Sequence, residues 1–153
     1  MEIIDFFSEK CIVKLDTEDK FESLKILVNL LSKSDKVTNQ KALEKAIIDR
    51  ENLMSTGIGY GIAIPHAREK SVKDFIIALG IHKNGISYES IDDKPVHLIF
   101  MIASPENKNR EYIIIMSKLS VILKDTELRE KILASDSEKE IYQIIRNKLA
   151  TSE

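Results

Sequence analysis

Residues 61–68 read Gly-Ile-Ala-Ile-Pro-His-Ala-Arg. The β-forming residues that open this stretch favour a short strand, and Pro65 ends the strand because proline has no backbone N–H to donate. His66 and Arg68 follow at once, so an imidazole and a guanidinium stand where a rigid strand ends. A strand that only filled a core would need neither side chain. We infer that the stretch carries a functional site within a sheet.

Glycine alternates with other residues just before this strand, at Gly57, Gly59 and Gly61. Glycine leaves the backbone free to turn or to be approached closely, which suits a site that receives a ligand. The alternation also resembles a dinucleotide-binding loop. That fingerprint requires a helix after it and a third glycine where Ile62 stands, so we exclude a dinucleotide loop.

Helices are expected on the N-terminal side of the glycines. Asp16 or Thr17 can cap a first helix, in which apolar residues recur at helical spacing to about Ser32. Thr38 is the expected cap of a second helix with an apolar stripe on one side. Arg50 lies at the C-terminal end of that helix, where a positive charge favours the helix dipole.

The period of the apolar residues changes after the glycines, from helical spacing to strand-like runs. Strands are expected at residues 62–64, 75–82 and 96–103, and helices at residues 111–123, 128–133 and from a Ser137/Glu140 cap onward. The pair Asn84-Gly85 predicts a tight hairpin into Ser87 and Tyr88. The sequence therefore predicts an α/β fold with a mixed parallel and antiparallel sheet flanked by helices.

The composition favours one ordinary domain over residues 1–153, because the chain has 153 residues, only 3 prolines and no linker tract. Lys and Arg number 23 against 25 Asp and Glu, a net charge of −2 that provides no general attraction to nucleic acid or anionic lipid. No apolar segment approaches the roughly 20 residues of a membrane span. The single Cys11 and an acidic N-terminus unlike a secretory signal favour a cytoplasmic location.

His66 is the sharpest catalytic candidate, although an arbitrary histidine at a strand end is more often structural. A neutral imidazole is a nucleophile that can take a phosphoryl group. A phosphoryl group on His66 needs a nearby fork of hydrogen-bond donors. Arg50, which precedes the glycines by a few residues, is the candidate donor, whereas Arg68 is expected to be a solvated charge. His82 and His97 lie in apolar runs without metal-ligand spacing, so we expect no metal or cofactor, with zinc a remote alternative.

The chain resembles the fructose/mannitol-type (type-2) enzyme IIA of the bacterial phosphoenolpyruvate-dependent sugar phosphotransferase system (PTS). The resemblance rests on residues 50–57, Arg-Glu-Asn-Leu-Met-Ser-Thr-Gly, and on residues 61–68, and it continues through residues 96–100 to Arg129. It implies that His66 receives a phosphoryl group from the phosphocarrier HPr and passes it to a thiol of enzyme IIB. It also implies that the membrane is involved only indirectly, through the enzyme IIC permease.

The resemblance assigns further roles to residues of the site. Arg50 aligns with the active-site arginine that balances charge on the phosphoryl group, and backbone N–H groups near Gly61 or in residues 104–109 are additional candidate donors. Tyr112 stands where family members with full transport activity usually carry a second histidine. A tyrosine hydroxyl can donate one hydrogen bond but offers no positive charge near neutral pH. Tyr112 is therefore a candidate donor that supports the acceptor.

The family also contains stand-alone nitrogen-type members, which regulate other proteins through their phosphorylation state and transport no sugar. The sequence leaves this alternative open beside sugar transport. It also leaves open the sugar, the cognate enzyme IIB and the oligomeric state.

Overall fold

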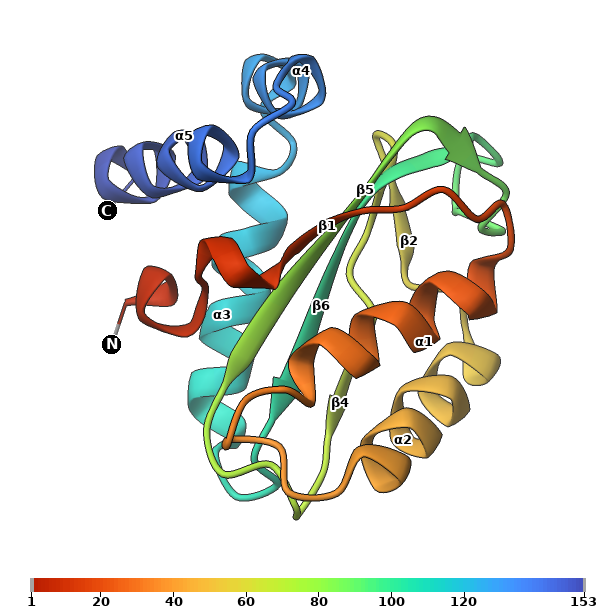
Figure 1. Ribbon diagram of the computed structural model, residues 1–153, viewed down its shortest axis with the longest axis vertical. Coiled ribbons are helices and arrows are strands. Elements are labelled where there is room, and N and C mark those ends of the chain that lie inside the picture. Colours follow the sequence, from red (N-terminus) through yellow and green to blue (C-terminus); the bar gives the residue numbers. More distant parts are fainter. Residues whose placement is uncertain (1, 153) are drawn as a thin grey trace.

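The computed structural model describes residues 2–152 (Figure 1). Within them, a six-stranded sheet has the order β1-β5-β6-β3-β2, and β4 pairs with β6 alone. β5 and β6 pair antiparallel, whereas β1 on β5 and both β3 and β4 on β6 are parallel. The strands are β1 (Ile12–Lys14), β2 (Gly57–Gly59), β3 (Ile62–Ala63), β4 (His66–Arg68), β5 (Ile76–Ile86) and β6 (Val96–Ser104). The predicted mixed sheet is confirmed.

Short 3-10 helices and α-helices complete the described part of the fold. Their bounds are η1 (Ile3–Phe6), η2 (Glu9–Cys11), α1 (Lys20–Leu31), α2 (Gln40–Leu53), α3 (Asn109–Ile122), α4 (Thr126–Ala134) and α5 (Glu138–Thr151). The predicted Ser137 cap of α5 is confirmed, since its Oγ accepts from the N–H of Glu140. The other two predicted caps are wrong: Asp19 caps α1 and Asn39 caps α2. Each lies directly before its helix and accepts from a free N–H of the first turn. No helix within residues 2–152 is long and apolar enough to cross a membrane.

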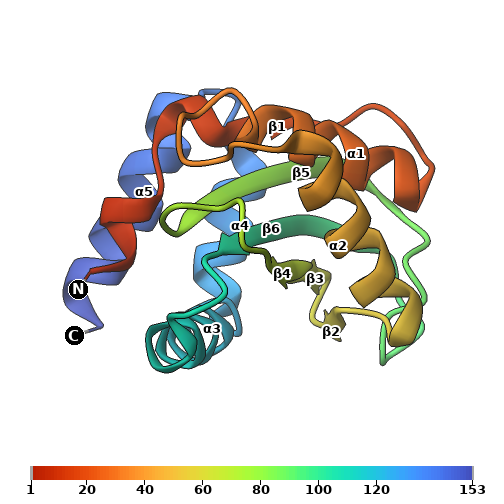
Figure 2. The same ribbon diagram turned by 90° about the horizontal axis from the view of Figure 1, so that it is seen from below.

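The helices form two layers, one on each face of the sheet (Figure 2). α1 and α2 cover one face, and α3 and α5 cover the other. β5 and β6 are apolar on both sides because alternate residues enter different cores: Phe100 and Ile102 pack toward α3, whereas Ile99 and Met101 pack toward α1 and α2. The prediction that residues 96–103 form a central, doubly covered strand is confirmed.

The tight hairpin predicted at Asn84-Gly85 is wrong. β5 continues through this pair to Ile86, which lies opposite Val96 on β6 after a register shift. Gly85 has φ +81°, and a Cβ there would lie 2.8 Å from Cβ of Pro95. A glycine is therefore needed at this irregularity within β5. Pairing with β6 outweighs the local turn preference of the dipeptide.

The predicted strand of residues 62–64 is interrupted at Ile64 and Pro65. β3 ends at Ala63, and the chain rejoins β6 as β4, which begins at His66. Both segments run parallel to β6, with Ile62 opposite Leu98 and His66 opposite Ile102. The expectation that His66 follows the end of a strand is therefore corrected: His66 opens a second strand segment.

Candidate functional site

β4 places His66 on the α3 side of the sheet. Ala67 packs into the core under α1 and α2, so the alternation of a strand puts His66 and Arg68 on the opposite face. The ring of His66, half-buried, contacts the ring of Tyr112 in the first turn of α3, with 5.6 Å between ring centroids. The structure thus brings together His66 and Tyr112, as the alignment predicted.

The backbone next to Pro65 fixes which nitrogen of His66 is reactive. Nδ1 of His66 lies 2.8 Å from the carbonyl oxygen of Ile64. A carbonyl only accepts hydrogen bonds, so Nδ1 carries the proton and donates it. In the neutral ring, Nε2 then holds the free lone pair and is the nucleophilic atom.

The surroundings favour this neutral form of His66. Burial is the largest effect that lowers the pKa of His66 below its ordinary value of 6.5, and the positive charges of Arg50 and Arg68 act in the same direction. The hydrogen bond to Ile64 and the charge of Glu51 oppose them. The ring is therefore neutral at pH 7 and able to attack an electrophilic phosphorus.

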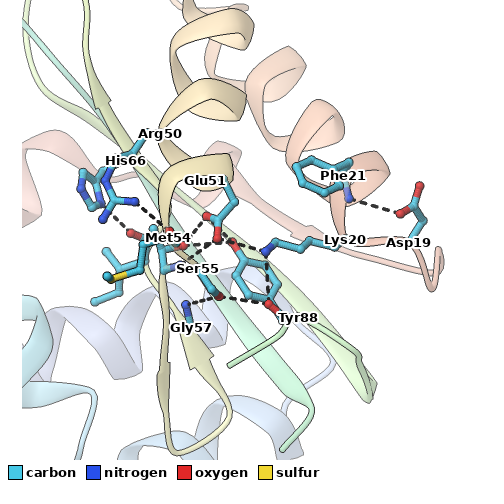
Figure 3. A network of polar contacts seen from close by, with 12 residues as sticks. Asp19, Lys20, Phe21, Arg50, Glu51, Met54, Ser55, Gly57, His66 and Tyr88 are labelled. Atoms are coloured by element: carbon cyan, nitrogen blue, oxygen red, sulfur yellow. Dashed lines mark hydrogen bonds and ion pairs between the residues drawn. The ribbon is translucent and has the colours of Figure 1, made fainter. Parts of the chain in front are cut away.

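Arg50 reaches the site from the last turn of α2. One of its N–H groups donates to the carbonyl oxygen of Met54 at 2.8 Å, which holds the side chain beside His66 (Figure 3). Both the pKa effect and the close-up place this charge near the imidazole. Met54 uses one donor of the guanidinium and leaves the others available to an anion. The structure therefore brings Arg50 near His66, and its pairing with a phosphoryl group on that histidine stays a prediction.

A buried polar network holds the end of α2 in place, and the sequence reasoning did not single it out. The carboxylate of Glu51, whose residue is 3% exposed, accepts from the N–H and hydroxyl of Thr56 at 2.7 and 2.5 Å and from the hydroxyl of Tyr88 at 3.0 Å. Lys20 of α1 pairs with it at 3.1 Å and also donates to the carbonyl of Tyr88 (Figure 3). Burial and the charge of Glu51 raise the pKa of Tyr88, which keeps its hydroxyl protonated. The network ties α1, α2 and the segment after β5 to the turn that carries Arg50.

A sequence signal for this network exists in α2. Leu43, Ile47 and Glu51 recur every fourth residue and form the buried face of the helix. A carboxylate on an apolar stripe needs a partner, because an unpaired buried charge is costly. That position distinguishes Glu51 from the exposed Asp49 on the same helix.

Gly59 and Gly61 do not line the site. Gly59, Tyr60 and Gly61 have φ of 92°, 61° and 75° and form the tight turn between β2 and β3. Ile62 lies opposite Leu98 and His66 opposite Ile102, which are about 13 Å apart along β6, so the turn lies far from the imidazole. The expectation that N–H groups near Gly61 reach a phosphoryl group on His66 is wrong, because Gly61 belongs to the turn that precedes β3.

The other histidines stay apart from the site. His82 is buried, and neither of its ring nitrogens has a hydrogen-bond partner among residues 2–152. Nδ1 of His97 lies near the carbonyl oxygens of His82 and Lys83. Within residues 2–152, no group of three or more His, Cys, Asp or Glu side chains is placed to hold a metal ion.

Three proteins show what this chain is similar to in sequence or in fold. The fructose-specific PTS EIIABC component of Bacillus subtilis (strain 168) is 39% identical over 146 residues, which are 95% of this chain and 23% of that protein. The crystal structure of the nitrogen regulatory protein IIA-Ntr from Neisseria meningitidis superposes with a TM-score of 0.87 at 28% identity, over 94% of this chain and 98% of that one. The complex of IIA mannitol with phosphorylated IIB mannitol from Escherichia coli has the same fold, with a TM-score of 0.79 at 22% identity over 92% and 99% of the two chains.

One protein family matches nearly the whole sequence. It is the family described as "Phosphoenolpyruvate-dependent sugar phosphotransferase system, EIIA 2", and the match covers residues 5–148. Its members support a role in phosphoryl transfer, which agrees with a free Nε2 beside an arginine. The chain therefore belongs to the type-2 EIIA family of the phosphoenolpyruvate-dependent sugar phosphotransferase system.

Proposed function

We propose that the chain is a phosphohistidine carrier that accepts a phosphoryl group from phospho-HPr on His66 and passes it to a cysteine of an enzyme IIB. The hydrogen bond from Nδ1 of His66 to Ile64 carries the proposal, because it leaves Nε2 unprotonated in a half-buried ring beside Arg50. No metal or cofactor enters the reaction as proposed.

The transfer is a pair of nucleophilic displacements at phosphorus. The lone pair of Nε2 of His66 attacks the phosphorus of phospho-HPr, and the P–N bond to the donor histidine breaks. Nδ1 keeps its proton and its bond to Ile64 throughout. A thiolate of enzyme IIB then attacks the same phosphorus, and the electron pair of the P–Nε2 bond returns to the ring. Arg50 offsets the charge of the phosphoryl oxygens in both steps.

Exposed apolar side chains beside the site support a function that depends on protein partners. Leu53 and Met54, at the end of the helix that carries Arg50, are 83% and 71% exposed, and Ile113, next to Tyr112, is 60% exposed. Exposed apolar residues of this kind mark protein interaction surfaces when they cluster. The solved complex of IIA mannitol with phosphorylated IIB mannitol, whose IIA shares this fold, supports an enzyme IIB as the partner.

The substrate class follows the relatives. The B. subtilis relative is named for fructose, and we propose uptake of a fructose- or mannitol-like sugar through a permease component, enzyme IIC, so that this chain itself acts in the cytoplasm. The close superposition on IIA-Ntr favours one second candidate, a nitrogen-type regulator that signals by binding proteins according to its phosphorylation state. Efficient phosphoryl transfer to a sugar-specific enzyme IIB would identify a transport component and not a nitrogen-type regulator.

The test is incubation of the protein with phosphoenolpyruvate, enzyme I and HPr, followed by mass mapping of the label. We expect one acid-labile phosphoryl group on His66 and none in His66→Ala, whose far-UV circular dichroism stays that of the wild type. Acid-stable label, or label retained in His66→Ala, contradicts the assignment.

A further inference from the structure

Arg68 is exposed, as expected, but its guanidinium also contacts residues of the site. It follows His66 by two residues on β4, on the same face of the sheet, about 6.6 Å further along the strand. An N–H of its guanidinium donates to Oδ1 of Asn109, the first residue of α3. The guanidinium carbon lies 5.3 Å from the centre of the Tyr112 ring, the same ring that contacts His66.

The partners that hold Arg68 are neutral. Asn109 contributes an amide oxygen and Tyr112 an aromatic face, and in the part of the chain that the structure describes Arg68 forms no ion pair with a carboxylate. Lys148, by contrast, pairs with Asp125 at 2.6 Å. The charge of Arg68 is therefore not neutralised locally, and the N–H groups that Asn109 does not use stay available to an anion.

A phosphoryl group brings more negative charge than one arginine offsets, because it carries roughly −1.5 to −2 at pH 7. Arg50 reaches His66 from α2, on one side. We propose that Arg68, held by Asn109 against Tyr112, offsets the remaining charge from the α3 side, so that two guanidiniums flank a phosphoryl group on His66. This inference rests on the proposed function and extends it.

The arrangement also accounts for a tyrosine at position 112. A tyrosine carries no charge at neutral pH, and burial raises the pKa of Tyr112 further. Its ring is instead a platform on which an arginine can stack. The positive charge on the α3 side then comes from Arg68, and Tyr112 positions it.

The first arm of the test needs no phosphoryl group. The charged and titratable groups around the ring of His66 are Arg50 and Glu51 of α2, Arg68 of β4 and Tyr112 of α3. We expect Arg68→Ala to raise the pKa of His66, measured by NMR titration of its ring protons, and Arg68→Lys to leave it near the wild-type value. Arg146→Ala on the exposed face of α5 removes the same charge elsewhere and serves as the control.

The second arm measures single-turnover transfer from phospho-HPr to the same variants. Arg68→Ala should slow transfer by about tenfold, equivalent to about 1.4 kcal/mol, with Arg68→Lys between it and the wild type and Arg146→Ala unchanged. Equal rates and equal His66 pKa values in wild type and Arg68→Ala overturn the role of Arg68. A wild-type protein without label on His66 contradicts the proposed function instead, so the two failures are distinct.

Discussion

The carbonyl oxygen of Ile64 and Nδ1 of His66 lie 2.8 Å apart, and this one contact sets the chemistry of the imidazole. The carbonyl is available to the imidazole because β3 ends at Ala63 and the pairing with β6 resumes only at His66, so Ile64 lies between the two strands. The interruption between β3 and β4 therefore sets the tautomer of His66. The acceptor is a backbone carbonyl, so substitution of the Ile64 side chain does not remove it.

The phosphoryl group should sit on Nε2 of His66. Nδ1 is committed to Ile64 and cannot attack without losing its proton and its hydrogen bond. Long-range proton, nitrogen and phosphorus NMR of the labelled protein assigns the bonded nitrogen. A phosphorus coupled to Nδ1 contradicts the tautomer derived from the structure.

Arg50→Lys should slow transfer from phospho-HPr by tenfold or more, a loss of about 1.4 kcal/mol or above, because lysine keeps the charge but not the planar fork. The measurement is single-turnover transfer, with Arg146→Lys on α5 as the matched control. The free energy of unfolding should hardly change. Unaltered transfer in Arg50→Lys means that Arg50 is only a surface charge.

Tyr112→Phe should keep the ring contacts with His66 and Arg68 but slow phosphoryl loss to enzyme IIB. Within residues 2–152 the hydroxyl of Tyr112 has no hydrogen-bond partner, so it is free to donate to a phosphoryl oxygen. Because that oxygen is charged, the bond contributes about 1.5–3 kcal/mol. Tyr112→His should quicken transfer to IIB if the chain serves transport. Identical rates for wild type and both variants exclude a role for the hydroxyl.

Glu51→Gln should lower the free energy of unfolding by about 3–5 kcal/mol, because it leaves Lys20 buried without its counter-charge. The matched control is Asp49→Asn on the same helix, whose exposed pair with Lys45 is worth about 0.3–0.5 kcal/mol. Urea denaturation measures both. Similar losses in the two variants show that the network around Glu51 adds no more than an exposed pair.

Acid should reduce both the stability and the acceptor activity of the protein through His66. Its pKa is lowered in the folded state, so below its ordinary value of 6.5 the unfolded chain binds a proton that the folded protein excludes. This contribution to stability is constant above about pH 7.5, falls as the pH drops below 6.5, and levels off under the lowered pKa. Unfolding free energies of wild type and His66→Gln from pH 5 to 8 measure it. A difference between the two proteins that does not change with pH contradicts the lowered pKa.

Local patterns in the sequence predicted the elements around the site. Apolar spacing located α1, α2 and α3, and the apolar run of β6 indicated a strand covered on both faces, because each pattern reflects which side of an element is buried. The hairpin predicted at Asn84-Gly85 was wrong because the turn preference of a dipeptide is weaker than continued pairing of β5 with β6.

The sequence by itself determined the class of fold, the family and the candidates His66, Arg50 and Tyr112, because motif and periodicity are properties of neighbouring residues. Only the tertiary structure decided that Nε2 is the free nitrogen, that Glu51 is buried against Lys20, and that Arg68 stacks on Tyr112 with Asn109. The contacts of Glu51 and Arg68 join groups that are far apart in the chain. The free nitrogen of His66 depends on the interruption between β3 and β4, which both pair with β6. Packing brings such groups to within a few ångströms, and no local pattern encodes those distances.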